Sequence, residues 1–176
     1  MCFLIRTQHL RLLWLLMIHV LLRSFNCAAE PTKGGGTDFF ALTLKSLQQP
    51  KAVSLAEYKN KNIILSFFEP DCPWCYQQIM TLKKLQARCA DNTQIILIGV
   101  HATRQQLQQE LRRVKTNLPA FEVNQTLLEI TGPIAATPLT YFFNGAGIPS
   151  QVIRGYAPYH PAFEAACKTS LATTER

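Results

Sequence analysis

The chain has 176 residues, 48% of them hydrophobic and 16% charged, which fits one globular domain preceded by an apolar leader. Its formal charge of +7 falls to +4 when the three arginines of the first 29 residues are set aside. The remaining basic residues are scattered, whereas nucleic-acid-binding surfaces gather them in one patch or stripe. We therefore expect no nucleic acid among the partners.

Residues 1–29 are typical of an export signal. Arg6 and Arg11 provide a positive start, residues 12–22 form an apolar segment, and residues 27–29, Cys-Ala-Ala, form a small-residue cleavage site. The apolar segment is shorter than the roughly 20 residues that a bilayer core requires. We therefore expect a cleaved signal peptide. A retained signal anchor is the second interpretation, and a lipid anchor on the cysteine of the cleavage site is the third.

The start of the mature chain predicts a tether and a hairpin. Residues 30–37 contain a proline and three consecutive glycines, which indicates a flexible tether before a single domain over residues 38–176. Residues 39–44 and 51–54 bracket the sequence Gln-Gln-Pro, a pattern that predicts a β-hairpin. A short helical turn is expected over residues 55–59.

Two cysteines stand three positions apart where an apolar strand gives way to an amphipathic helix. Residues 62–68 are β-branched and aromatic, which is typical of a strand buried on both faces. Pro73 suits the first position of a helix, where a missing N–H costs nothing, and apolar residues then recur at helical spacing to about Cys89. This pattern places Cys72 at the helix N-terminus and Cys75 one turn in, facing the protein.

This placement predicts thiol–disulfide exchange, because free N–H groups and the helix dipole stabilise a thiolate, the attacking species. Cys72 is expected to attack and Cys75 to resolve. Pro73 and Trp74 between them should tune the reduction potential, and the pair needs no further cofactor to carry two electrons. The alternative is half of a zinc site, but the sequence offers no second pair of ligands, so we expect no metal.

Two carboxylates precede the motif. Asp71 places a negative charge beside Cys72 and disfavours its thiolate, which favours a reductant over a strong oxidant. Glu69 is a candidate acid or base near the cysteines. An ordinary solvated turn carboxylate is an equally good interpretation of Glu69.

The second half of the chain alternates strands and helices. This alternation predicts an α/β domain with right-handed crossovers around central strands. The expected elements are strands over residues 94–100, 139–143 and 150–154, and helices over residues 104–115, 125–131 and 162–169.

Four cysteines follow the leader, and two of them lie outside the motif. In an oxidising compartment, Cys89 and Cys167 are candidates for one structural disulfide. Two buried thiols are the alternative, and the spacing does not decide between the two interpretations.

Four stretches of the chain, over residues 38–42, 53–61, 67–75 and 136–143, together resemble one family. They resemble the thioredoxin-fold thiol:disulfide oxidoreductases, and among these the bacterial, exported TlpA/ResA-like (redoxin) group. The resemblance implies a thioredoxin fold, with a central mixed β-sheet flanked by helices and an N-terminal β-hairpin extension. It also implies a periplasmic location.

The same resemblance makes Thr137 and Pro138 a second functional element. It implies a cis-proline loop that faces the active-site disulfide. Proline cannot donate to the sheet there, so the backbone of Thr137 would be free to bind an extended substrate segment. An ordinary proline at a strand entry is the alternative. The resemblance also places the helices that carry Cys89 and Cys167 on one face of the sheet.

We therefore expect exchange with protein thiols and disulfides outside the cytoplasm, by a monomeric reductant supplied by a membrane thiol donor. A periplasmic disulfide oxidase or isomerase is one alternative, although an isomerase normally dimerises and no dimerisation segment is evident. A copper(I)-binding or chaperone module that uses Cys72 and Cys75 is an alternative from another class. Ser66 stands where thioredoxin itself has a buried acid, so the proton acceptor for Cys75 is left open.

Overall fold

The computed structural model describes residues 38–89 and 92–168. The chain divides into two units, and all of these residues belong to the second, Gly36–Arg176. The predicted leader, the tether and the end of the chain lie outside the described residues. Among those described, no helix has the length and hydropathy that crossing a membrane requires.

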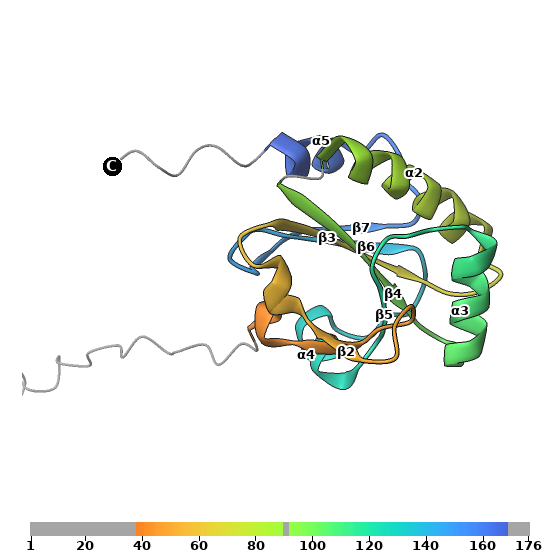
Figure 1. Ribbon diagram of the computed structural model, residues 1–176. Helices are drawn as coiled ribbons and strands as arrows, with labels where there is room; N and C mark the ends of the chain where they lie inside the picture. The colour runs from red at the N-terminus through yellow and green to blue at the C-terminus, as the bar shows by residue number, and fades with distance from the viewer. Residues whose placement is uncertain (1–37, 90–91, 169–176) are drawn as a thin grey trace, which may run out of the picture. The chain divides into compact units, whose positions relative to one another are not determined.

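Five strands form one mixed sheet in the order β5-β4-β3-β6-β7 (Figure 1). The central strand, β3, pairs in parallel with β4 on one side and antiparallel with β6 on the other. The outer strands follow the same senses, β5 parallel to β4 and β7 antiparallel to β6. The strands are β3 (Asn62–Phe68), β4 (Thr93–Gly99), β5 (Ala120–Glu122), β6 (Leu139–Phe143) and β7 (Pro149–Arg154).

Helices cover the sheet on both sides, as Figure 1 shows. The core on one side contains residues of α2 (Pro73–Cys89), α3 (Arg104–Arg113) and α5 (Pro161–Lys168). The core on the other side contains residues of α4 (Gln125–Thr131) and of two 3-10 helices, η1 (Phe39–Ala41) and η2 (Leu55–Tyr58). This arrangement confirms the predicted thioredoxin fold.

The apolar run of β3 is explained by these two layers. Ile64 and Phe68 pack in the core beneath α2, while Ile63, Leu65 and Phe67 pack in the core on the opposite side. Successive side chains of a strand point to opposite faces, so a strand covered on both faces is apolar at most of its positions, and the buried Ser66 is the exception here.

The N-terminal hairpin is shorter than predicted. It consists of β1 (Thr43–Lys45) and β2 (Ala52–Ser54), and η1 replaces the first part of the expected strand. The consecutive side chains Phe39 and Phe40 are both buried, which an alternating strand on one face cannot achieve. In addition, the Asp38 carboxylate caps η1 by accepting the N–H of Phe40 at 3.0 Å.

The segment after β1 closes the edge of the sheet at β5, a strand that the sequence analysis did not predict. Ser46 forms an antiparallel bridge with Phe121, and the N–H of Leu47 donates to the carbonyl oxygen of Ala120 at 2.8 Å. The side-chain oxygen of Gln48 accepts the N–H of Ala120 at 3.2 Å. These contacts join the hairpin to the main sheet.

Candidate functional site

The two motif cysteines lie where β3 ends and α2 begins, as predicted. Asp71 occupies the left-handed region at φ 56°, which Asp tolerates better than most residues, and α2 begins at Pro73. Cys72 and Cys75 form a disulfide with their Cα atoms 5.2 Å apart. Cys72 is partly exposed, whereas Cys75 is 1% exposed. An attacking partner can therefore approach Cys72 and not Cys75.

The first turn of α2 directs a donor at the outer sulfur. The backbone N–H of Cys75 donates to the Sγ atom of Cys72 at 3.1 Å. In the reduced protein the same N–H, together with the positive end of the helix dipole, favours negative charge on that sulfur. The N–H of Cys75 is therefore placed to stabilise the thiolate that is predicted for Cys72.

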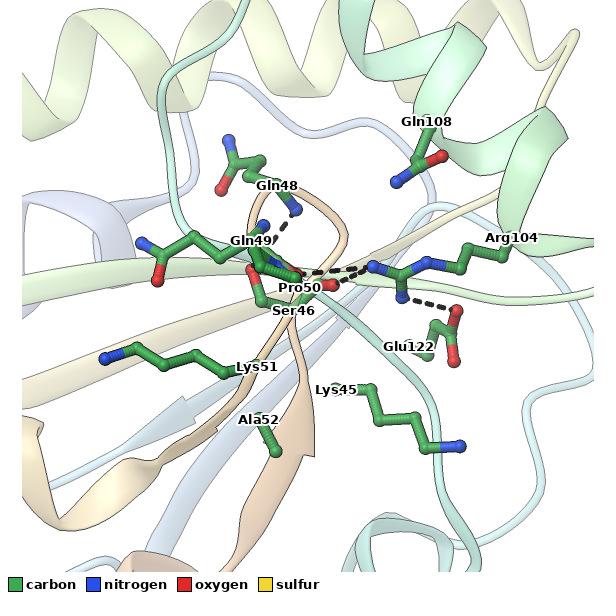
Figure 2. Close-up of a pocket in the computed structure, with 10 residues that line it drawn as sticks. All are labelled: Lys45, Ser46, Gln48, Gln49, Pro50, Lys51, Ala52, Arg104, Gln108 and Glu122. Carbon is green, nitrogen blue, oxygen red and sulfur yellow. Dashed lines mark hydrogen bonds and ion pairs between the residues drawn. The ribbon is translucent and has the colours of Figure 1, made fainter.

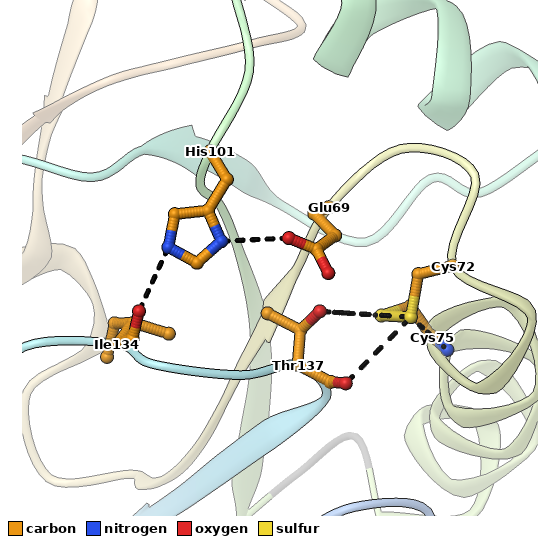
Figure 3. A network of polar contacts seen from close by, with 6 residues as sticks. All are labelled: Glu69, Cys72, Cys75, His101, Ile134 and Thr137. Carbon is orange, nitrogen blue, oxygen red and sulfur yellow. Dashed lines mark hydrogen bonds and ion pairs between the residues drawn. A yellow bond between two sulfur atoms is a disulfide. The ribbon is translucent and has the colours of Figure 1, made fainter.

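The loop before β6 places Thr137 against both sulfur atoms (Figure 3). The Oγ1 atom of Thr137 lies 3.2 Å from the Sγ atom of Cys75 and 3.8 Å from that of Cys72. A disulfide has no proton to give, so the threonine hydroxyl is the donor in these contacts. The carbonyl oxygen of Thr137 lies 4.0 Å from the Sγ atom of Cys72, and the peptide bond from Thr137 to Pro138 is cis.

Glu69 has a partner that the sequence analysis did not find. Its Oε2 atom lies 2.8 Å from Nδ1 of His101, and Nε2 of His101 lies 2.9 Å from the carbonyl oxygen of Ile134. The signal available in the sequence was topological, because His101 follows β4 and the parallel strands β3 and β4 end at the same edge of the sheet.

Trp74 lies on the surface next to the disulfide. Its side chain is 62% exposed, and its ring stacks on that of Tyr156 with centroids 5.9 Å apart. Tyr156, from the loop after β7, was not among the predicted site residues. The rings of Trp74 and Tyr156 give the site an aromatic border.

The family of the chain follows from a comparison of its sequence with models of known families. The model of the redoxin family matches residues 35–132, which include β3, the motif and the start of the crossover to β6. The chain belongs to the redoxin family. In a search of curated proteins, no protein matches this redoxin.

Solved structures with the same fold include a disulfide oxidoreductase and a thiol:disulfide interchange protein. A thiol:disulfide interchange protein of the thioredoxin family from Chlorobium tepidum is 20% identical, with 75% of this chain and 97% of that chain covered and a TM-score of 0.63. A secreted disulfide oxidoreductase of Mycobacterium tuberculosis, homologous to E. coli DsbE, is 14% identical. The match covers 74% of this chain and 97% of that chain, with a TM-score of 0.60. StoA from Bacillus subtilis is 16% identical, with 70% of this chain and 93% of that chain covered and a TM-score of 0.58. Family and fold together confirm that the redoxin is an oxidoreductase.

Beneath the disulfide, the redoxin has neutral polar groups in place of a buried acid. Ser66 and Thr140 face each other across β3 and β6 with 3.1 Å between their hydroxyl oxygens, and Nε2 of Gln78 donates to Thr140 at 3.5 Å. The Oε1 atom of Gln78 is buried without a hydrogen-bond partner among the described residues. Gln78 lies one turn after Cys75 on the inner face of α2 and was not among the predicted site residues.

Arg113 on α3 extends over the start of α2, and its positive charge interacts favourably with the carboxylate of Asp71. Its guanidinium makes two hydrogen bonds to the buried carboxylate of Glu110 and lies 5.3 Å from the centre of the Tyr76 ring. The bond to Glu110 is the main cause that raises the pKa of Arg113, and the charge of Asp71 acts in the same direction. The redoxin therefore places a lasting positive charge near the carboxylate that adjoins Cys72.

A second disulfide joins the last residue of α2 to α5. Cys89 and Cys167 are 78 residues apart in sequence, and their Cα atoms lie 5.0 Å apart. Cys89 belongs to the core that includes Ile79, Leu82 and Phe163, and the partly buried Cys167 packs against it. The bridge therefore anchors α5 to the helix that carries the active-site cysteines.

No three His, Cys, Asp or Glu side chains in residues 38–89 and 92–168 are grouped to hold a metal ion. A hollow of about 690 Å³ opens instead between the β1–β2 loop and α3 (Figure 2). Its central cation, Arg104, is already paired with Glu122 and with the carbonyl oxygen of Ser46, so it is not available to a charged ligand.

Proposed function

We propose that this redoxin reduces disulfides of proteins outside the cytoplasm. The observation that carries the proposal is the asymmetry of the pair: Cys72 is accessible and receives an N–H bond, whereas Cys75 is buried behind it. This asymmetry supports Cys72 as the nucleophile and Cys75 as the resolving thiol. The redox-active pair itself carries the electrons, with no other cofactor.

The proposed reaction has two exchange steps. The Cys72 thiolate attacks a partner disulfide, forms a mixed disulfide and releases one partner thiolate, which takes up a proton. Cys75 then loses its proton and attacks the Cys72 sulfur, which releases the second partner thiolate to be protonated in turn. The partner has gained two electrons and two protons, and the redoxin is left with the Cys72–Cys75 disulfide.

The substrate side of the site is assigned to Thr137 and the aromatic border. The Thr137 carbonyl lies near the Cys72 sulfur, which supports backbone pairing with an extended partner segment in the loop before Pro138. Pro73 and Trp74 tune the couple, and Trp74 with Tyr156 supports docking of an apolar side chain beside the partner cysteine.

The location and the direction of electron flow are also part of the proposal. The predicted leader supports export to the periplasm, by cleavage or with the leader as an anchor. The carboxylate of Asp71 beside Cys72 supports a reductant, and Arg113 moderates that effect. A reductant in an oxidising compartment must be re-reduced, so we assign it a membrane thiol donor and a monomeric working state. Cys89–Cys167 is assigned a structural role.

The midpoint potential of the Cys72–Cys75 couple tests the direction. Residues 30–176 would be equilibrated in glutathione or dithiothreitol buffers, with Cys89 and Cys167 replaced by Ala so that one couple is read. We expect a value near that of thioredoxin, about −270 mV, or lower. A value near −120 mV, as in DsbA, would make the protein an oxidase and overturn the proposed direction.

A trapping experiment tests the roles of the two cysteines. Cys75→Ser should accumulate a mixed disulfide between Cys72 and a protein partner, because the resolving thiol is absent. Cys72→Ser should trap nothing and lose activity. Activity retained by Cys72→Ser would make the nucleophile assignment wrong. Purification of the native protein with stoichiometric copper bound to the cysteines would favour the metal-binding alternative.

A further inference from the structure

His101 connects the two segments that form the redox site. Glu69, which accepts at Nδ1, is three residues before Cys72, and Ile134, whose carbonyl oxygen accepts at Nε2, is three residues before Thr137. Figure 3 shows the imidazole between these two partners, with Glu69 on the side of the thiols. One side chain from the end of β4 therefore contacts both the motif turn and the loop before β6.

The two contacts fix where protons must be. A carbonyl oxygen only accepts, so Nε2 of His101 carries a proton. An ionised carboxylate also only accepts, so Nδ1 carries a second proton, unless Glu69 is itself protonated and donates to a neutral ring. In both cases His101 and Glu69 share one proton beyond that on Nε2. When that proton leaves, one ring proton remains for two acceptors, so His101 loses its contact with either Glu69 or the carbonyl oxygen of Ile134.

The backbone of His101 supports a specific role. The residue has φ 57°, in the left-handed region, which is unfavourable for a residue other than glycine. The preceding residue is fixed by a bond from the N–H of Val100 to the carbonyl oxygen of Phe68 at 3.0 Å. The unfavourable conformation turns the imidazole towards its two partners and is held by them.

Glu69 is the one titratable side chain that contacts His101 among the described residues. Asp71 and the two cysteines lie further along the same turn and helix. Arg104, on α3, pairs with Glu122 of β5 at 2.8 Å. The segment from Gly132 to Ala136 contributes no titratable side chain. A proton that leaves the pair therefore breaks the contact of His101 with Glu69 or with the carbonyl oxygen of Ile134.

We propose that His101 is a positioning residue for disulfide exchange, and that it holds the Thr137 loop against the Cys72 turn only while it shares a proton with Glu69. The proposal rests on the proposed function, because it assigns substrate binding to Thr137 and attack to Cys72. Loss of the shared proton to solvent breaks one of the two contacts of the ring, so the turn and the loop are no longer linked and protein substrates then meet a less ordered site.

Two variants distinguish the effect of the shared proton from the effect of the link between the two segments. Glu69→Gln provides an amide N–H that donates to Nδ1 of a neutral ring, so the link survives without the shared proton. His101→Asn removes the link while keeping a residue that tolerates positive φ. His160→Asn, in the loop before α5, is the matched histidine control.

The readout is the rate of insulin reduction divided by the rate with a small aromatic disulfide, from about pH 5 to about pH 9. The division removes the titration of Cys72, which both reactions share. The ratio for the native protein should fall by about 3- to 10-fold as pH rises, which corresponds to the loss of one net hydrogen bond. The ratio of the two rates should stay high over the whole pH range in Glu69→Gln and low in His101→Asn. In the control, His160→Asn, the ratio should follow that of the native protein. A Glu69→Gln profile that falls like the native one would overturn the proposal.

Ring ¹⁵N spectra of His101 test the proposal independently of activity. The native ring should lose one proton as pH rises, and the Thr137 amide signal should move with it, whereas in Glu69→Gln the Thr137 signal should stay constant. A Thr137 signal that ignores the His101 titration would overturn the positioning role. Failure of the native protein to reduce insulin, with these spectral changes present, would instead count against the proposed function alone.

Discussion

The hydroxyl of Thr137 lies 3.2 Å from the Sγ atom of Cys75, although 62 residues separate the two in the chain. The sheet order explains the contact. β3 and β6 are antiparallel neighbours in which Phe67 pairs with Leu139, so the last residues of β3 lie beside the first residues of β6 at one end of the sheet. The motif turn and the loop before β6 must therefore meet.

Thr137→Val should slow attack by Cys72, because it preserves shape and removes the hydroxyl donor to the sulfur atoms. We expect about a 3- to 10-fold lower rate with a small disulfide at neutral pH, the effect of one hydrogen bond. Ultraviolet absorbance of the thiolate should show a smaller ionised fraction at the same pH. Thr137→Ser keeps the hydroxyl and serves as control, so equal rates for the Val and Ser variants would contradict the assignment.

Asp71→Asn should make the couple less reducing. The change removes a negative charge beside Cys72 while keeping a residue that tolerates φ 56°. A more stable thiolate stabilises the reduced state, so the midpoint should rise by about 10–30 mV. Glu129→Gln, an exposed change on α4 across the sheet, is the charge control. An unchanged midpoint in Asp71→Asn would show that Arg113 fully compensates the carboxylate.

Trp74→Ala should affect protein substrates selectively. The exposed ring stacks on Tyr156 and borders the disulfide, so its loss removes docking surface without changing the sulfur atoms. We expect insulin reduction to slow by about 5-fold, or about 1 kcal/mol, with little change for a small disulfide. Tyr159→Ala removes a ring for which no stacking is seen and should change neither rate. Equal losses for both substrates would point to an effect on the motif instead.

Replacement of both Cys89 and Cys167 by Ala should destabilise the fold. The bridge closes a segment of 78 residues, and its removal should cost about 2–4 kcal/mol in urea unfolding. The matched variant Cys72→Ala with Cys75→Ala opens a much shorter loop and should lose about half as much. A larger loss in the motif variant would contradict a structural role for Cys89–Cys167.

The sequence predicted those parts of the fold in which local pattern and burial agree. β3 and α2 were predicted within a residue of their bounds, because a strand covered on both faces is apolar at most of its positions and a proline marks the helix start. η1 was missed because two adjacent aromatic side chains share one core. β5 was missed because three residues are too few to show a period.

The candidate site was predicted where its residues are neighbours in sequence or follow a family motif. Cys72 and Cys75 belong to the first kind and Thr137 to the second. His101 and Tyr156 were missed, because each reaches the site from a separate loop and has no motif of its own. Their roles depend on which strand ends share an edge, and that is a property of the three-dimensional sheet.

The closure of β5 by the hairpin decides where another chain could add a strand. Leu47 and Gln48 already occupy the outer backbone groups of Ala120, so that side of the sheet offers no template for intermolecular pairing. In the described part of the chain, the opposite edge is β7, which begins with Pro149 and ends with Arg154. Proline lacks an N–H, and a charge at an edge resists stacking of chains. Strand addition to the main sheet at high protein concentration is therefore confined to the few residues of β7 between them.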